Sequence, residues 1–500
     1  MREIILKNDP ELKDLLDELK NYCRKDDLIM ARLVYDFADK AHEGQMRKSG
    51  VPYIKHCLAT AYILAKMKID IGIIIAALLH DVPEDTHVTL EEVEKNFGHD
   101  VASLVKGVTK LGKLKYRGVE RYIENLRKMF VAMAEDIRVM IIKFADRINN
   151  LATLDALPPK KRHRIALESL EIYAPIANRL GMGEFKSLLE DLSFPHIYPK
   201  EYEKVFQVRQ DYLAGQQAYL DRVMQIAREE MTAAGINWSD VHGREKTLYS
   251  LYKKILSKGW DNVDKVYDIV AIRIIVGDVG DCYAALGIIH KLWRPLKGRI
   301  KDYISQPKPN GYKSLHTTVF CAEGRIVEFQ IRDAEMHGEA EHGIAAHWHY
   351  DEQGAKIPAR DINWAVELAS IQKNILEKIS DLNELKVDFF RNRIFVFTPQ
   401  GDVMDLPEDA TPIDFAYNIH TDVGNHCNGA KVNDQMVSLD APLKSGDVVE
   451  IIMDKNRKGP SPDWLKTVKT HSAKSRIKSN LKHSRSSLWL QMILPKPKKK

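Results

Sequence analysis

The sequence predicts a multidomain protein of the α plus α/β class, and three observations lead to this prediction. Residues 1–195 contain long segments whose apolar residues recur at helical spacing. Within 241–352, Val- and Ile-rich runs such as "VYDIVAIRII" and a hairpin pattern predict a buried sheet. In 391–455, short strands separated by turn residues predict a small β-rich module. A length of 500 residues allows three to four such domains.

Three less regular segments complete the predicted organisation. We expect a helical connector at 196–240, a helical linker at 353–390 and a basic helical tail at 456–500. After Asp463 the chain has eleven Lys or Arg and no acidic residue, and without these eleven charges the net charge of +5 becomes −6. The tail is typical either of a segment facing nucleic acid or of a solvated chain end.

Composition and terminal sequence exclude some classes of protein. The chain has no stretch of about 18 consecutive apolar residues, so no membrane contact is expected. The N-terminus "MREIILKNDPELK" carries acidic residues and no cleavage site, which argues against a signal peptide. The five cysteines form no CxxC pair, so neither structural zinc nor a disulfide framework is expected. These features fit a soluble protein of the reducing cytoplasm.

The string "ALLHDVPEDT" at 77–86 is the first candidate site. It passes from apolar residues into four ionisable ones, His80, Asp81, Glu84 and Asp85. On one helix these four would share a broad face, and Pro83 should end or kink that helix. Taken alone, an adjacent His-Asp pair is more often a capped helix end than a metal site.

Two other helical segments supply partners for this pair. His56 is expected early in a helix that begins near Pro52, and Asp146, Asn150 and Thr153 form one stripe of a later helix. The combined set of nitrogen and oxygen donors is typical of Mn²⁺ rather than Mg²⁺: His56, His80, Asp81 and Asp146. Glu84 and Asp85 remain to orient an attacking water. With these partners the metal site becomes the favoured interpretation.

Residues 241–352 carry a second candidate site. "GREKTLYSLYKK" supplies cations for a triphosphate, and Asp268 interrupts the apolar face of a strand expected over 266–276. Glu328 shares a face with Gln330 in a hairpin that turns at 323–324. Two carboxylates on neighbouring strands can hold Mg²⁺ and activate a hydroxyl, as phosphoryl transfer requires. Tyr312 could stack a base. A solvated helix face and ordinary packing remain the alternatives.

These strings together resemble a known family. "GQMRKSGVPYIKH", "ALLHDVPEDT" and "KFADRINNLAT" resemble the HD-superfamily hydrolase domain of the long Rel/SpoT enzymes. "GREKTLYSLYKK", "VYDIVAIRII" and "VEFQIRDAEMHGEAEHGIAAHWHY" resemble their synthetase domain, and "AYNIHTDVGNHCNGAKVN" resembles their TGS domain. The resemblance implies an all-helical HD domain, an α/β nucleotidyltransferase-like domain and a small β-grasp-like TGS domain. The usual C-terminal regulatory domains of the family are not recognisable in this sequence.

In the hydrolase domain, the resemblance implies removal of the 3′-pyrophosphate from (p)ppGpp. The four ligands named above would hold Mn²⁺, while Glu84 and Asp85 would be catalytic. The nucleotide would meet Arg47, Lys48, Asn150 and Thr153. Three residues depart from the family pattern, Pro83, Asn149 and Ala152, and none of them is a metal ligand.

In the synthetase domain, the resemblance implies transfer of pyrophosphate from ATP to the 3′-OH of GDP or GTP. Asp268 and Glu328 would bind Mg²⁺ and act in catalysis, with Arg273 expected on the strand face opposite Asp268. Nucleotide-binding roles are implied for Arg244, Lys246, Lys254, Arg273, Lys301, Tyr312 and His316. Lys301 belongs to "RIKD" (299–302), the basic form typical of bifunctional members. Asp333 departs from the usual Thr.

The resemblance also implies partners. His420 would approach the 3′ end of deacylated tRNA on the ribosome, followed by the basic segment as an RNA-proximal region. Because two opposed activities would waste ATP, we expect reciprocal control through 196–240. Two narrower functions stay open: a (p)ppGpp hydrolase with a vestigial synthetase, and a ribosome-binding regulatory protein. Formation of a homo-oligomer is also left open.

Overall fold

The computed structural model describes residues 9–112, 135–260, 268–308, 310–343, 393–399, 403–444, 447–454, 459–470 and 472–481, with positions 129, 132, 266 and 457. The chain divides into two compact units, residues 1–376 and 377–500, which are described separately below. The expected linker at 353–390 and residues 482–500 of the expected tail lie outside the described residues.

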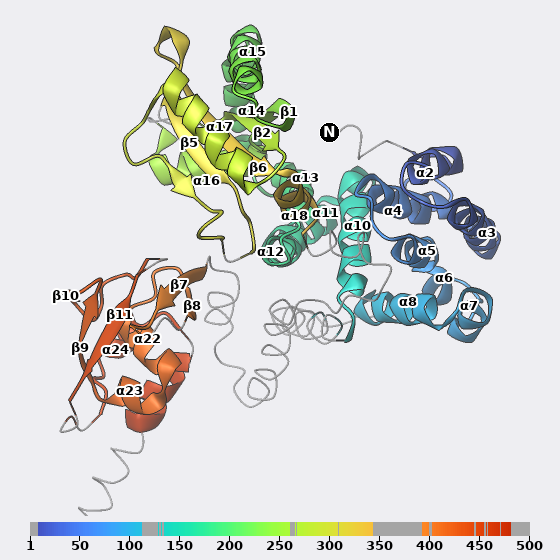
Figure 1. Cartoon of the computed structure of the whole chain (residues 1–500). Helices are drawn as coiled ribbons and strands as arrows, with labels where there is room; N and C mark the ends of the chain where they lie inside the picture. The colour runs from blue at the N-terminus through green and yellow to red at the C-terminus, as the bar shows by residue number, and fades with distance from the viewer. Residues whose placement is uncertain are drawn as a thin grey trace, which may run out of the picture. The chain divides into compact units, whose positions relative to one another are not determined.

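The first part of unit 1 is helical (Figure 1). Its elements are α2 (Leu12–Leu19), α3 (Lys25–Ala41), α4 (Ile54–Lys66), α5 (Ile71–Leu79), α6 (Val82–Asp85), α7 (Leu90–Phe97), α8 (His99–Gly112), α10 (Arg138–Ala152), η1 (Leu154–Ala156), α11 (Pro159–Glu168), η2 (Ser169–Tyr173), α12 (Ala174–Arg179) and α13 (Gly183–Ile197).

Helix α5 is the centre of this helical part. Its sequence, "IGIIIAALL", is apolar on every side, so the helix must be covered all round. It packs against α3, α4, α8 and α10. Asp70 caps its N-terminus by accepting a hydrogen bond from the backbone N–H of Gly72. The buried helix therefore delivers its C-terminal end to a fixed position.

The expectation of one helix carrying all four ionisable groups after residue 79 is wrong. Helix α5 ends at Leu79, His80 and Asp81 form the junction, and α6 is a separate short helix. Pro83 lies in the first turn of α6 rather than at the end of α5. A first-turn proline loses no helical hydrogen bond, because the first N–H groups of a helix have no intrahelical acceptor.

Three long helices lead from the helical part into a sheet: α13, α14 (Pro199–Leu213) and α15 (Gln217–Ala233). The sheet is six-stranded and mixed, with strand order β1-β2-β6-β5-β3, and β4 pairs with β5. Only β2 and β6 are parallel. The strands are β1 (Trp238–Glu245), β2 (Val270–Val276), β3 (Arg294–Pro295), β4 (Lys301–Asp302), β5 (Leu315–Phe320) and β6 (Ile326–Asp333).

The two faces of this sheet differ in chemistry. Helix α17 (Val279–Leu292) covers an apolar face that includes Ile272, Phe329 and Ile331 (Figure 1). The residues that alternate with these along the strands point to the opposite face and are largely polar. The predicted hairpin is confirmed, since β5 and β6 are joined by η4 (Ala322–Gly324), where Glu323 has a φ of 60°.

Two further helices border the sheet. Helix α16 (Leu248–Lys258) follows β1, and α18 (Ala334–His342) follows β6. Asp333 caps α18 by accepting a hydrogen bond from the backbone N–H of Met336. Threonine also caps helices well, so this departure from the family pattern preserves a capping residue.

Unit 2 contains a small β-rich module. Its elements are β7 (Arg393–Phe397), β8 (Val403–Pro407), α22 (Pro412–Ile419), α23 (Thr421–Asn425), β9 (Cys427–Val432), β10 (Gln435–Val437), β11 (Val449–Met453) and α24 (Trp464–Thr467). The strands β7 and β8 form one antiparallel pair, and β10-β9-β11 form an antiparallel sheet.

The basic segment begins as part of this module rather than as a solvated end. Trp464, Val468, Ala473 and Ile477 are buried together with residues of α22. The buried carboxylate of Asp414 accepts hydrogen bonds from the backbone N–H groups of residues 469 and 470. Among the described residues, no helix has both the length and the apolar character needed to cross a bilayer.

Candidate active sites

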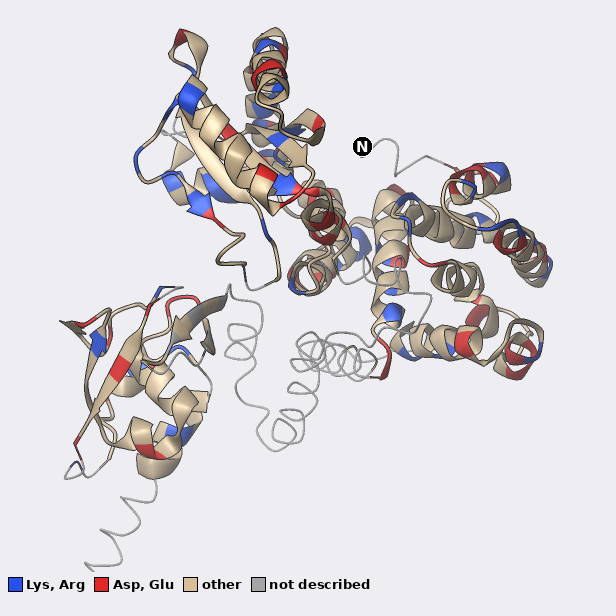
Figure 2. Ribbon diagram, viewed as in Figure 1, with Lys and Arg blue, Asp and Glu red and all other residues tan. Residues whose placement is uncertain are grey.

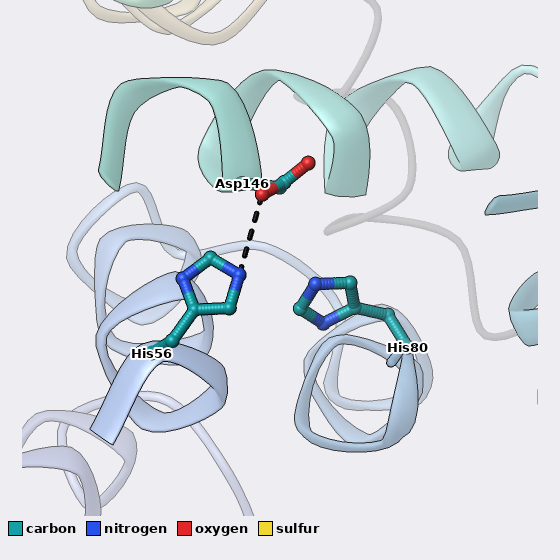
Figure 3. Close-up of side chains that lie close together, drawn as sticks. All are labelled: His56, His80 and Asp146. Carbon is teal, nitrogen blue, oxygen red and sulfur yellow. Dashed lines mark ion pairs between the residues drawn. The ribbon is translucent and has the colours of Figure 1, made fainter. Parts of the chain in front are cut away.

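The first predicted cluster is assembled from two helices and the junction between α5 and α6. His56 lies in α4, His80 is the C-cap of α5, Asp81 precedes α6, and Asp146 lies in α10. Ligand atoms of His56, His80 and Asp146 lie within 4.8 Å of one another. Figure 3 shows the His56 ring and the Asp146 carboxylate pointing toward each other, with the His80 ring alongside. The structure therefore brings all four predicted ligands together.

The distances within the cluster suit a shared cation. His56 Nε2 lies 3.3 Å from Asp146 Oδ1 and 3.4 Å from Asp81 Oδ2, and His80 Nε2 lies 3.2 Å from Asp81 Oδ2. Cys57, which the sequence did not single out, is also near His80 and Asp81. Burial raises the pKa of the Cys57 thiol well above its usual range, which disfavours the thiolate that a metal requires.

Both imidazoles are oriented by hydrogen bonds at Nδ1. His80 Nδ1 lies 2.7 Å from the carbonyl oxygen of Ala77, and His56 Nδ1 lies 2.7 Å from Oδ1 of Asn149. These acceptors favour a proton on Nδ1 and direct each Nε2 atom into the cluster, while Arg47 Nη1 also lies 3.2 Å from His56 Nδ1. His80 Nε2 is buried without a hydrogen-bond partner among the described residues. A buried acceptor of this kind fits a metal ion, so the residues present fit a divalent cation.

Charge in the cluster is strongly coupled. Burial raises the pKa of Asp146, but the Lys143 ammonium and the His56 hydrogen bond outweigh it and hold this pKa well below the usual range. Burial lowers the pKa of His56, but hydrogen bonds to Asp146 and Asp81 raise it to about 9. A cation bound here would displace the Nε2 proton of His56, because ligand nitrogens must be unprotonated.

The two carboxylates predicted to act on water lie on α6. Figure 2 shows that Asp and Glu gather on α6 and α7. The Tyr53 hydroxyl lies 2.9 Å from Asp81 Oδ2 and 2.7 Å from Asp85 Oδ2. Glu84 and Asp85 are both exposed. Tyr53 thus joins a predicted ligand to a predicted catalytic carboxylate, a link that only the fold reveals.

A cavity of about 120 Å³ adjoins the cluster. Its lining includes Arg47, Thr153 and Ala152, together with His56. Arg47 donates hydrogen bonds to Asn149 Oδ1 (3.1 Å) and to Asn150 (2.7 Å). Lys48 is exposed and does not line this cavity. Alanine at 152 adds no charge to this lining, whose cations are Arg47 and Lys55.

The second candidate site differs from the prediction at Asp268. The strand β2 begins only at Val270, so Asp268 lies in the preceding turn and strand alternation does not govern its direction. Its Oδ2 lies 2.8 Å from Lys246 Nζ and 2.6 Å from Lys254 Nζ. These two ammonium groups overcome the effect of burial and lower the pKa of Asp268 to about 2.

The polar face of the sheet gathers the other predicted residues. One row of strand neighbours runs His242, Arg273, Gln330, His316 and Lys301, and the adjacent row contains Arg244, Ala271, Glu328 and Thr318. The expectation that Arg273 faces away from Asp268 assumed that both residues belong to one strand. This assumption is wrong, because β2 begins only at Val270. Figure 2 shows several Lys and Arg segments on and around this sheet.

Arg273 has a partner that the sequence did not indicate. The residue is 4% exposed, and its Nη1 lies 2.7 Å from Glu341 Oε1 on α18. Burial of Arg273, together with the charges of Arg332 and Arg244, lowers its pKa to about 10. The Nε and Nη2 atoms of Arg273 have no hydrogen-bond partner among the described residues.

Tyr312 and His316 lie beside Glu328. The Tyr312 hydroxyl is 2.8 Å from His316 Nε2, and His316 Nδ1 is 3.4 Å from Glu328 Oε1. Gln330 donates a 3.0 Å hydrogen bond to the same Glu328 oxygen.

In unit 2, the predicted tRNA-binding residue His420 is exposed and caps α23.

Three family descriptions match separate parts of the chain. An HD domain matches residues 34–183, a region found in RelA/SpoT proteins matches 243–355, and a TGS domain matches 394–453. The predicted fold class, with a helical part, a mixed sheet and a small antiparallel sheet, is confirmed by these matches and by the structure.

Curated relatives match most of the chain. The GTP pyrophosphokinase of Myxococcus xanthus is 45% identical over 480 residues, which are 95% of this chain and 63% of the relative. The guanosine-3′,5′-bis(diphosphate) 3′-pyrophosphohydrolase of Aquifex aeolicus is 47% identical, over 91% and 65%. The bifunctional (p)ppGpp synthase/hydrolase SpoT of Escherichia coli is 44% identical, over 93% and 66%. The chain thus spans slightly less than two thirds of these relatives, and it belongs to the RelA/SpoT family.

Proposed function

We propose that the chain both makes and degrades (p)ppGpp, at two separate sites. The observation that carries this proposal is that the chain contains two separate clusters of buried or half-buried carboxylates. Each cluster is held in place by hydrogen bonds or ion pairs from its own part of the chain. His80 Nε2 is a buried acceptor aimed at the hydrolase cluster, and Asp268 holds two lysines at the synthetase site. Relatives that bear one or the other enzyme name, and one named as bifunctional, support the same proposal.

At the first site, water attacks the phosphorus attached to the 3′ oxygen of (p)ppGpp. The bond between that phosphorus and the 3′ oxygen breaks, giving pyrophosphate and GDP or GTP, and the 3′ oxygen takes a proton. His56, His80, Asp81 and Asp146 would hold Mn²⁺, which when bound lowers the pKa of water and polarises the phosphoryl group. Asp85, held by Tyr53, and Glu84 orient the water and accept its proton.

At the second site, the 3′ oxygen of GDP or GTP attacks the β-phosphorus of ATP. The bond from that phosphorus to the oxygen bridging the α-phosphate breaks, AMP leaves, and the 3′-OH proton passes to Glu328. Mg²⁺ held by Asp268 and Glu328 would neutralise phosphate charge. Lys246, Lys254, Lys301 and His316 meet the phosphates, while Arg244 and Arg273 flank adenine and Tyr312 stacks guanine.

The remaining partners follow from unit 2. His420, together with Lys and Arg of the segment folded onto the module, would contact deacylated tRNA on the ribosome. The net charge of the chain after Asp463 supports an RNA-facing role, since cations there would meet phosphate. An enzyme with these substrates and partners acts in the cytoplasm.

The test measures (p)ppGpp turnover in both directions on the purified full chain, with Mn²⁺ added or chelated. Asp81→Ala should abolish hydrolysis and retain synthesis, and Asp268→Ala should do the reverse. A wild-type rate of hydrolysis in Asp81→Ala would contradict the metal assignment. Absence of pyrophosphate transfer from labelled ATP, with and without ribosomes and uncharged tRNA, would leave a hydrolase with a vestigial synthetase.

A further inference from the structure

A line of polar side chains leads from the buried Arg332 to Glu328 across the polar face of the sheet. Arg332 Nη2 donates a 2.8 Å hydrogen bond to the Tyr312 hydroxyl. That hydroxyl lies 2.8 Å from His316 Nε2, and His316 Nδ1 lies 3.4 Å from Glu328 Oε1. The last distance exceeds an ideal hydrogen bond, but catalytic hydrogen bonds often shorten only when substrate binds.

The chemistry of the two ends fixes the direction of every proton in this line. An ionised Glu328 can only accept, so Nδ1 of His316 must carry a proton. Burial lowers the pKa of His316 and outweighs the opposing hydrogen bond and charge of Glu328, and Lys308 and Arg332 lower it further, so the neutral ring is favoured and its Nε2 accepts. The Tyr312 hydroxyl therefore donates to Nε2. Its oxygen accepts from Arg332, which can only donate.

Arg332 is an unusual residue to find in this position. Its side chain is 0% exposed, and its guanidinium carbon lies 5.1 Å from the centroid of the Tyr312 ring. Its Nε and Nη1 atoms have no hydrogen-bond partner among the described residues. A buried cation with so few hydrogen bonds costs stability, so its retention calls for a functional reason.

We propose that Arg332 is a positioning residue for synthesis: through Tyr312 and His316 it fixes the carboxylate of Glu328 that takes the proton from the 3′-OH. This inference rests on the proposed synthetase function. Arg332 holds the Tyr312 hydroxyl with its proton toward His316, which sets the ring tautomer that contacts Glu328. Gln330, two residues after Glu328 on β6, donates a 3.0 Å hydrogen bond to the same carboxylate oxygen.

The decisive variant is Tyr312→Phe, measured on the full chain. It keeps the aromatic ring that would stack guanine and removes only the hydroxyl that links Arg332 to His316. We expect kcat for synthesis to fall at least about tenfold, within the range that a misplaced general base costs, while KM for GDP changes by less than about twofold. The ¹⁵N spectrum of His316 should also lose the signature of the Nδ1-protonated neutral ring.

Tyr303→Phe is the matched control. The Tyr303 ring lies edge-on to both Tyr312 and His316, with centroid distances of 6.1 and 5.3 Å. Its hydroxyl makes no hydrogen bond within the described part of the chain, so this variant should keep the wild-type kcat and the wild-type His316 spectrum.

Arg332→Met tests the far end of the line. It should lower kcat for synthesis as Tyr312→Phe does, and the double variant should be no slower than the slower single variant, because both changes break the same connection. The hydrolysis rate of the same sample reports whether the chain has folded. If Arg332→Met fails to fold, Tyr312→Phe still decides.

The outcomes separate this inference from the proposed function. A wild-type chain that makes no (p)ppGpp would remove the synthetase function itself. An active wild type with an unchanged kcat in Tyr312→Phe would overturn the role of Arg332. A higher KM for GDP with unchanged kcat would also overturn it, because Tyr312 would then act only by binding guanine.

Discussion

Asn149→Ala should weaken metal binding at the hydrolase site although Asn149 is not a ligand. In the folded chain its Oδ1 lies 2.7 Å from His56 Nδ1 and 3.1 Å from Arg47 Nη1. Removing the amide takes away the acceptor that keeps the proton on Nδ1. Nδ1 of His56 can then accept from Arg47 Nη1, which lies 3.2 Å away, and the proton on Nε2, the atom that faces Asp81 and Asp146, becomes harder for the metal to displace.

The size of the effect follows from the class of contact. Loss of a residue that orients a ligating imidazole typically weakens metal affinity 10- to 100-fold. A tenfold change corresponds to about 1.4 kcal/mol, so the expected loss is about 1.4–2.8 kcal/mol of binding free energy. Because His56 and Asn149 both line the cavity beside the cluster, water can take the place of the lost amide, which favours the lower part of this range.

The assay is a calorimetric titration of Mn²⁺ into the purified chain, with Mn²⁺-dependent (p)ppGpp hydrolysis as the second readout. Asn96→Ala on α7 is the control, since its amide only donates to the carbonyl oxygen of Glu92 on an exposed surface. Equal Mn²⁺ affinity, within twofold, for Asn149→Ala and the wild type would refute the reasoning, because His56 would then hold its tautomer without this acceptor.

Three further predictions concern the packing around the sites. Burial and the charge of Glu341 raise the pKa of Glu184 to about 7, so its ionisation destabilises the fold as pH rises from about 4.5 to 7. Glu184→Gln should therefore raise the unfolding free energy by about 1–3 kcal/mol at pH 8 and far less at pH 5, in thermal melts at the two pH values. An equal effect at both values would contradict this. Asp191 caps α16 through two backbone N–H groups, and Asp191→Ala should cost about 1–2 kcal/mol and reduce synthesis more than hydrolysis in paired assays. Asp414→Ala should speed hydrogen exchange at residues 464–481, and unchanged exchange would show that the buried carboxylate does not hold this segment.

The sequence was most informative where chemistry and helical spacing coincide. His56, His80, Asp81 and Asp146 were predicted from donor type and spacing, and the fold brings them within contact distance. Helical periodicity specifies which residues share a face. Because α5 is buried, its packing also fixes where the ionisable residues that follow it must lie. Residue type had already suggested Tyr312 and the cations of "GREKTLYSLYKK", and the resemblance to a known family added the other nucleotide-binding residues.

Errors in the prediction have local causes. Alternation along a run of apolar residues placed Asp268 inside a strand, but the strand begins two residues later because β1 pairs with β2 only from Val270 onward. Pro83 was expected to end or kink a helix, whereas it lies in the first turn of one. Both errors are shifts of an element boundary, which periodicity locates poorly since end residues are held by caps and turns rather than by the pattern.

Other residues were missed because their partners lie far away in sequence. Asn149 acts through His56, Glu341 through Arg273, and Arg332 through Tyr312. Each pair is joined by tertiary packing across separate elements, and no spacing rule within one helix or strand relates them. Trp464 was likewise assigned to a tail by charge, although its burial against α22 makes it part of a core.

Helix α13 connects the structural supports of both sites. It packs against α10, which carries Asp146, and its Asp191 carboxylate caps α16, which carries Lys254. At its N-terminus a Cβ on Gly183 would lie 2.7 Å from the backbone oxygen of residue 340, so α18 can approach only because glycine stands there. Closely packed helices shift as units rather than deform, so a displacement of α10 on nucleotide binding would reach α16 and α18 through α13. Reciprocal control through 196–240 stays a prediction, and α13, which runs into the start of that connector, is the segment whose contacts with both sites could serve it.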